Sequence, residues 1–145
     1  MNLKIFKARD VKMPTRGTRE SAGLDFYVPN DFDPIEILPG CSANIPSGIK
    51  TIFDKGYALV AFNKSGVALK KNLQVGACVV DSDYQGEIHL HVVNVGLATQ
   101  MIMPGEKLVQ FLMLPIELPG SNPVECIFSN FLLFFLQFNC SIISK

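Results

Sequence analysis

Two short apolar runs separated by a polar turn occupy residues 74–95, which read QVGACVVDSDYQGEIHLHVVNV. The runs Gln74–Val80 and Glu87–Val95 have the length and the β-branched content of strands. Between them, Asp81–Gly86 is rich in the residues that form tight turns. This stretch therefore predicts a β-hairpin.

The same rhythm of short apolar runs and turn residues continues in both directions along the chain. The turn residues 54–56 (Asp-Lys-Gly) predict a second hairpin, and Ser65–Lys71 is the one stretch that could form a short helix. Because no helical stretch separates successive strands, a βαβ fold is excluded. The pattern is typical of an all-β, many-stranded jelly roll. Further strands are expected at Leu3–Phe6, Leu24–Val28, Ile35–Leu38, Ile49–Phe53, Tyr57–Asn63, Thr99–Met103 and Lys107–Leu114.

Composition narrows the class of protein. The 145 residues suit one domain, and 13 basic against 13 acidic residues give zero net charge, which argues against a nucleic-acid binder. Residues 1–7 are too short and too charged for a signal peptide. The four cysteines have no CxxC spacing, so they are expected to be free thiols in the cytoplasm rather than a zinc site or disulfides.

Two polar features interrupt the apolar pattern of the first half. Asp25 lies in the apolar run that follows Gly23, where a carboxylate needs a partner, a metal or water, unless it caps a local turn. Asn63–Gly66 combines a cation, a hydroxyl and a glycine at the start of the expected helix. These groups favour an anion such as phosphate, although a simple capped turn has the same composition.

A third feature is the turn of the first hairpin. Asp81 at a strand end could act as a general base on water, and Tyr84 could stack against a flat or ringed ligand. Alternatively, the Asp-x-Asp pair is ordinary turn chemistry.

Together these features resemble the trimeric dUTP pyrophosphatases (dUTPases). The resemblance covers residues 9–115, nearly the whole body of the chain. Four segments match the family's first four motifs in order and spacing: Ala22–Asp25, Lys64–Lys70, Val79–Ile88 and Pro104–Gln110. The resemblance implies a distorted jelly roll of the β-clip type, a homotrimer with active sites between subunits, and hydrolysis of dUTP to dUMP and pyrophosphate with Mg²⁺.

The resemblance also assigns roles to individual residues. Asp81 would be the general base for the attacking water, and Asp25 would hold Mg²⁺ through water. Tyr84 would pack under the deoxyribose, and the backbone of the motif-three hairpin would read uracil. The substrate-binding residues implied in this way are Lys64, Ser65, Gly66, Val79, Tyr84 and Gln110.

Two positions depart from the family pattern. Lys64 stands where the family usually has Arg, so it keeps the charge but loses the bidentate fork. Cys78 stands where the family usually has Gly, and its Cβ would either crowd the base or be tolerated. His89 and His91 alternate with apolar residues on a strand, and we expect them to face the trimer axis or solvent.

The largest departure is at the end. The family closes its site with a glycine-rich segment carrying Arg and Phe, the fifth motif, and the last twenty residues here contain 13 apolar residues, no Gly and one charge. We therefore predict a dUTPase-like domain at 1–118 and an atypical apolar tail at 119–145. Without the lid, the chain is expected to bind dUTP but hydrolyse it poorly.

Alternatives stay open for the tail and for the function. The tail could be a C-terminal helix or membrane anchor, a swapped strand followed by a disordered end, or foreign sequence read after the frame leaves the family near Glu117–Glu125. The polar residues within Cys126–Ser144 argue against a membrane span. The alternative functions are a non-catalytic dUTP-binding regulatory protein and a dCTP deaminase relative, against which Asp81–Tyr84 argues.

Overall fold

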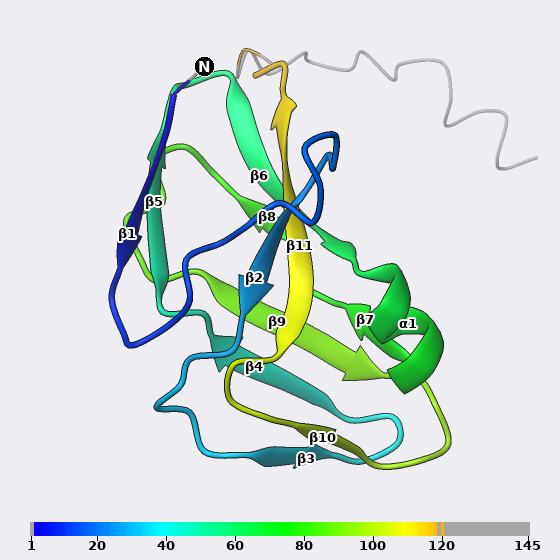
Figure 1. The fold of residues 1–145 in the computed structure, drawn as a ribbon. Coiled ribbons are helices and arrows are strands. Elements are labelled where there is room, and N and C mark those ends of the chain that lie inside the picture. The colour runs from blue at the N-terminus through cyan, green and yellow to red at the C-terminus, as the bar shows by residue number, and fades with distance from the viewer. Residues whose placement is uncertain (1, 119, 121–145) are drawn as a thin grey trace, which may run out of the picture.

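The computed structural model describes residues 2–118 and 120, and these form an all-β domain with one short helix (Figure 1). The all-β prediction is therefore confirmed. The strands are β1 (Leu3–Lys7), β2 (Leu24–Tyr27), β3 (Ile35–Ile37), β4 (Ser42–Pro46), β5 (Ile49–Phe53), β6 (Tyr57–Asn63), β7 (Leu73–Val75), β8 (Val79–Val80), β9 (His89–Asn94), β10 (Gln100–Ile102) and β11 (Lys107–Pro115), with helix α1 (Ser65–Lys71) between β6 and β7.

All strand pairs are antiparallel, as a jelly roll requires. The largest sheet has the order β2-β11-β6-β8, and β4-β9-β7 forms the second. Two further pairs, β1-β5 and β3-β10, flank them (Figure 1). Strand β11 is central to this arrangement, because it pairs with β2 on one side and with β6 on the other.

The core follows from the alternation of apolar side chains along these strands. Strand β5 alternates between buried and exposed residues at every position, and most of the largest fully buried side chains are aliphatic. Phe26 of β2 and Phe111 of β11 pack in a tilted arrangement with ring centroids 4.5 Å apart, which joins the two strands that carry the first and fourth motifs. Core packing thus positions the polar residues between them.

The hairpin predicted around residues 54–56 is wrong in its pairing, and the hairpin predicted over residues 74–95 is confirmed only for its outer part. Strands β5 and β6 belong to different sheets, because Gly56 turns the chain from one sheet to the next. The run Gln74–Val80 breaks at residues 76–78, so that β7 pairs with β9 and β8 turns away to pair with β6. Strand β4 was also missed. Turn residues reveal where a chain reverses, but the choice of partner depends on which apolar faces bury together.

The helix begins and ends at the predicted residues. It stops where Asn72 adopts a left-handed conformation with φ of 52°, and Lys70 and Lys71 lie in its last turn, where positive charge is favourable. None of the helical segments in the described residues is long and apolar enough to cross a membrane. The predictions for the tail concern residues that lie outside the described part of the chain, apart from residue 120.

Candidate active site

Asp25 is the centre of a buried charge cluster on β2. Its side chain is 4% exposed, and its Oδ1 accepts a hydrogen bond of 2.8 Å from Lys64 Nζ. Lys107 Nζ lies 3.1 Å from Oδ2 as an ion pair. Oδ2 still accepts no well-directed hydrogen bond from the described residues. Motifs one, two and four therefore meet at this carboxylate.

The two lysines control the ionisation of Asp25. Burial raises its pKa, but the close contacts with the Lys64 and Lys107 ammonium groups together outweigh burial and hold the pKa below its usual value. In return, the close contact with the Asp25 carboxylate raises the pKa of Lys107. The cluster thus carries an ionised carboxylate between two ammonium groups at neutral pH.

Replacement of Asp25 by Asn should lower the free energy of unfolding at pH 7 by about 2 kcal/mol, because hydrogen bonds to a charged group contribute in that range. A lowered pKa means that this contribution is present above the unfolded-state value of 3.8 and is lost as pH falls through the folded-state value. Urea unfolding from pH 7 to pH 3 should therefore show wild type and Asp25→Asn converging in acid. A constant difference across that range would contradict this account.

Gln110 lies beside this cluster on β11, in register with Asp25. Its Nε2 donates a 2.8 Å hydrogen bond to the backbone oxygen of Asn63, the residue before Lys64. Gly23 leaves the room that this side chain needs, because a Cβ there would lie 2.7 Å from Gln110 Oε1. The position of the motif-four glutamine therefore depends on glycine in motif one.

Ser65 and Gly66 begin α1, and both are exposed. A Cβ added at Gly66 would meet no atom within 4 Å, and Gly66 is not among the described glycines with positive φ. Glycine inside a helix costs roughly 1 kcal/mol relative to Ala. Neither intrachain packing nor backbone conformation therefore requires glycine here.

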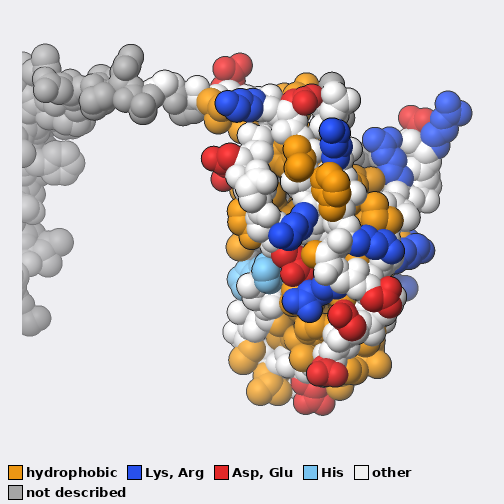
Figure 2. Space-filling view, turned by 90° about the vertical axis from the view of Figure 1, so that its left-hand side faces the viewer, with side chains coloured by type: hydrophobic (Ala, Val, Ile, Leu, Met, Phe, Trp, Pro, Cys, Tyr) orange, Lys and Arg blue, Asp and Glu red, His pale blue; other side chains and the backbone are white. Residues whose placement is uncertain are grey.

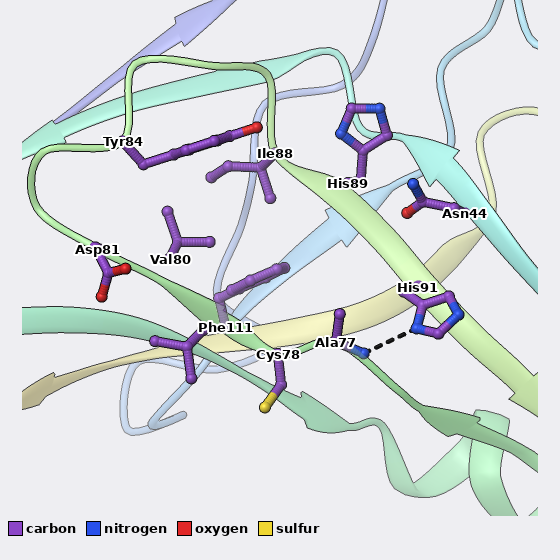
Figure 3. Close-up of a pocket in the computed structure, with 11 residues that line it drawn as sticks. Asn44, Ala77, Cys78, Val80, Asp81, Tyr84, Ile88, His89, His91 and Phe111 are labelled. Atoms are coloured by element: carbon purple, nitrogen blue, oxygen red, sulfur yellow. Dashed lines mark hydrogen bonds between the residues drawn. The ribbon is translucent and has the colours of Figure 1, made fainter.

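The second cluster lines a cavity of about 300 Å³ between β8, β9 and β11 (Figure 3). Asp81 lies at one end, directly after β8, and is exposed. Tyr84 spans the turn that follows, with its ring 43% exposed and its hydroxyl donating a 2.9 Å hydrogen bond to the backbone oxygen of Glu87. Val79 also lines the cavity. The predicted residues of motif three therefore share one hollow.

Gly86 makes the position of the Tyr84 ring possible. A Cβ at this residue would lie 2.4 Å from the Tyr84 hydroxyl oxygen, so only glycine lets the ring lie across the turn. The ring consequently presents a rigid flat surface beside Asp81.

Several residues of this cavity were not predicted from the sequence. Phe111, Asn44, His89 and His91 also line it, and the expectation that the two histidines face the trimer axis or solvent had given them no place there. Cys78 lines it as well, as its position in motif three suggested. Cys78 has no left-handed backbone, so a side chain is accommodated there without strain. The sequence signal that could have placed His89 and His91 together on one face of β9 was their alternation with the buried residues Leu90 and Val92.

The two clusters lie toward opposite ends of β6. Val80 pairs with Leu59 near the start of that strand, whereas Lys64 follows its last residue. At about 3.3 Å per residue, Asp81 and Lys64 are separated by roughly 20 Å along the strand. The structure thus does not bring all predicted site residues of one chain together.

The fit of Mg²⁺ can be judged from the donors present. Residues 2–118 and 120 contain no group of three or more His, Cys, Asp or Glu side chains able to hold a metal. Asp25 is ionised and its Oδ2 retains hydrogen-bonding capacity, but two lysines neutralise it. These residues fit an ion that arrives with its own phosphates and waters, which is typical of Mg²⁺.

The surface around these clusters mixes both signs of charge. On the face shown in Figure 2, Lys and Arg side chains are interspersed with Asp, Glu and apolar side chains. An antiparallel β domain with a cationic cluster and a separate cavity bounded by a carboxylate and an aromatic ring has the groups that suit the class of proteins that bind a small phosphorylated, ring-containing ligand.

The comparisons with known proteins make this class specific. A family model described as dUTPase matches residues 9–131, and the chain belongs to the dUTPase family. The match continues past residue 118, where the sequence had suggested a boundary.

Curated relatives agree with this assignment. The chain is 35% identical over 131 residues to the deoxyuridine 5′-triphosphate nucleotidohydrolase of Shigella sonnei, with 86% of each chain covered. It is 36% identical over 116 residues to the Klebsiella pneumoniae enzyme of the same name, covering 78% of this chain and 76% of the relative.

Solved structures show the same fold. The dUTPase from phage phi11 of S. aureus superimposes with a TM-score of 0.77 at 22% identity, covering 89% of this chain and 99% of the phage chain. A mutant of that phage dUTPase is described with a coordinated structural Mg(II) ion and has a TM-score of 0.76, covering 86% of this chain and 97% of that one. The β-clip form of the jelly roll is therefore the fold of this chain.

Proposed function

We propose that this chain hydrolyses dUTP to dUMP and pyrophosphate, with Mg²⁺, in a homotrimer whose active sites are shared between subunits. The observation that carries the proposal is the cavity in which Asp81 stands at one end beside the flat ring of Tyr84. A nucleotide hydrolase needs a base next to a ring-sized hollow, and a cationic surface for the phosphates.

The geometry of the cavity supports the roles that we propose for its residues. Asp81 orients and deprotonates the water that attacks the α-phosphorus, because its carboxylate is exposed at the strand end. Tyr84 packs under the deoxyribose, and the backbone around Val79 reads the uracil edge. Proton abstraction by a positioned carboxylate contributes about 10²–10⁴-fold in such reactions.

The phosphates bind at the first cluster, around Asp25 and Lys64. Lys64 supplies charge, Ser65 and Gln110 donate hydrogen bonds, and Gly66 leaves open space for the close approach of the ligand. When bound, Mg²⁺ would neutralise phosphate charge, and Asp25 would hold it through water. Asp25 meanwhile keeps the Lys64 ammonium beside the start of α1.

A shared site is supported by the separation of the two clusters. Because Asp81 and Lys64 of one chain lie roughly 20 Å apart along β6, a base from one subunit would serve phosphates held by another. A homotrimer supplies three such sites by symmetry. Cys41 and Cys78 are free thiols, which supports the cytoplasm as the compartment.

We expect residues 1–145 to hydrolyse dUTP slowly. Residues 119–145 contain one Gly and no Arg, so they do not supply the family's glycine-rich Arg/Phe lid. This composition also supports the second candidate function, a dUTP-binding regulatory protein with negligible turnover. A domain boundary near residue 118 rests on the change in composition alone, since the family model matches as far as residue 131.

Incubation of the chain with dUTP and, separately, dCTP in Mg²⁺ tests the proposal. Pyrophosphate and dUMP should appear from dUTP, slowly, and no ammonia should appear from dCTP. Binding of dUTP with no pyrophosphate at all would favour the regulatory function, whereas ammonia release would identify a deaminase. Sedimentation of the same sample should give a trimer, and a monomer would overturn the shared site.

A further inference from the structure

The segment Gly76–Cys78 connects β7 to β8 and forms part of the cavity wall. On one side, the Cys78 carbonyl accepts a 2.7 Å hydrogen bond from Ala61 N–H of β6. On the other side, Ala77 N–H donates a 2.8 Å hydrogen bond to His91 Nδ1, the contact drawn as a dashed line in Figure 3. The His91 side chain therefore ties this wall to β9.

Gly76 leaves the space that the His91 ring occupies. A Cβ at Gly76 would lie 2.1 Å from Nδ1 and 2.4 Å from Cε1 of that ring. The described glycines with positive φ do not include Gly76, so its backbone conformation does not require glycine. Glycine is needed at position 76 because the imidazole of His91 approaches the backbone there. Gly76 and His91 therefore depend on each other.

The hydrogen bond at Ala77 replaces a missing ladder contact. The β7 pairing with β9 ends at Val75, and Gly76 N–H still donates to the His91 backbone oxygen at 3.0 Å. Beyond that point the chain leaves β9 for β6, and the imidazole supplies the acceptor for the next amide. Since Nδ1 accepts, the ring proton sits on Nε2.

We propose that His91 is a positioning residue: it holds the Gly76–Cys78 wall in place and thereby sets the shape of the cavity for the base of the nucleotide. This role rests on the proposed function, in which the cavity takes the deoxyuridine moiety. His91 acts through the backbone of Ala77 and Cys78. It does not touch the reacting phosphate, which lies between the Asp81 end of the cavity and the phosphate-binding cluster of another subunit.

Two substitutions at His91 separate positioning from bulk stability. In H91N the amide Oδ1 stands near the position of Nδ1 and can still accept from Ala77, whereas H91L fills the space without an acceptor. The dUMP dissociation constant should rise about tenfold in H91L and stay within about twofold in H91N, because one hydrogen bond contributes on that order. The KM for dUTP should change in parallel, and kcat should change much less.

Amide hydrogen exchange gives a readout independent of the ligand. Exchange at Ala77 should accelerate about tenfold in H91L, and the buried β9 amides should keep wild-type rates. If Ala77 exchange does not change, His91 does not hold the wall. If it accelerates while dUMP affinity is unchanged, the wall does not shape the ligand site. A lowered Tm with unchanged affinity would likewise show a structural role only.

Gly76→Ala provides the second variant if H91L fails to fold. It should displace the ring and weaken dUMP binding in the wild-type background, but add little to H91A, which leaves the space of the ring empty and has already lost the acceptor. Equal effects in both backgrounds would overturn the pairing of Gly76 with His91. If wild type itself binds no dUMP, the proposed function fails, while Ala77 exchange still decides whether His91 holds the segment.

Discussion

Asp81→Asn should reduce dUTP hydrolysis by about 10³-fold, because the amide cannot take a proton from the attacking water. Asn has nearly the same shape as Asp, and Asp81 is exposed at the end of β8 and forms no ion pair with the other described residues, so the fold should be unaffected. The dissociation constant for dUTP should stay within a few-fold of wild type. Pyrophosphate release at saturating dUTP measures the effect.

Asp83→Asn is the matched control for this substitution. Asp83 lies on the same turn and is also exposed, but it does not line the cavity. It should retain near wild-type activity. Equal losses in the two variants would indicate a change in turn structure, and full activity of Asp81→Asn would remove this residue from the chemistry.

Replacement of residues 119–145 by a glycine-rich segment carrying one Arg and one Phe should raise kcat by about 10²-fold. A positioned cation at the developing phosphate charge contributes on that order. Closure of the segment over the nucleotide also excludes water and strengthens every electrostatic contact in the site. The comparison needs single-turnover rates for residues 1–145 and for the chimera, measured at the same Mg²⁺ concentration.

A second chimera with Gln in place of the grafted Arg separates the charge from the lid. It should bind dUTP as the first chimera does but lose most of the gain in kcat. If both chimeras stay as slow as residues 1–145, the low rate has its origin in the body of the domain, where Lys64 and Cys78 depart from the family. If residues 1–145 already turn over as fast as the chimera, the lid explanation is wrong.

Local signals in the sequence predicted most of the individual elements. Helix Ser65–Lys71 was placed at its observed bounds because the exit from a strand, the small residues at its start and the lysines at its end all act within a few residues. The sequence predicted that the run containing β7 pairs with the run containing β9, but it did not predict that β8 leaves this hairpin to pair with β6, because that choice depends on which apolar faces bury together. The wall at residues 76–78 arises from that split.

The candidate site divides in the same way. The side chains of motifs one to four were named from the sequence, because their chemistry and order are properties of the residues themselves. The pairing of Asp25 with both Lys64 and Lys107, and the hold of His91 on Ala77, depend on contacts across strands. No spacing rule reveals them, because the separations are set by the path of the chain.

By itself, the sequence determined the family, the all-β class and the residues that we propose to act on a nucleotide. Only the tertiary structure decided that these groups form two clusters roughly 20 Å apart along β6, one around Asp25 and one around Asp81. The physical reason is that strand pairing follows the burial of apolar faces over the whole domain. Phe26 and Phe111 bring motifs one and four together, while Val80 on β8 carries motif three toward the opposite end of β6.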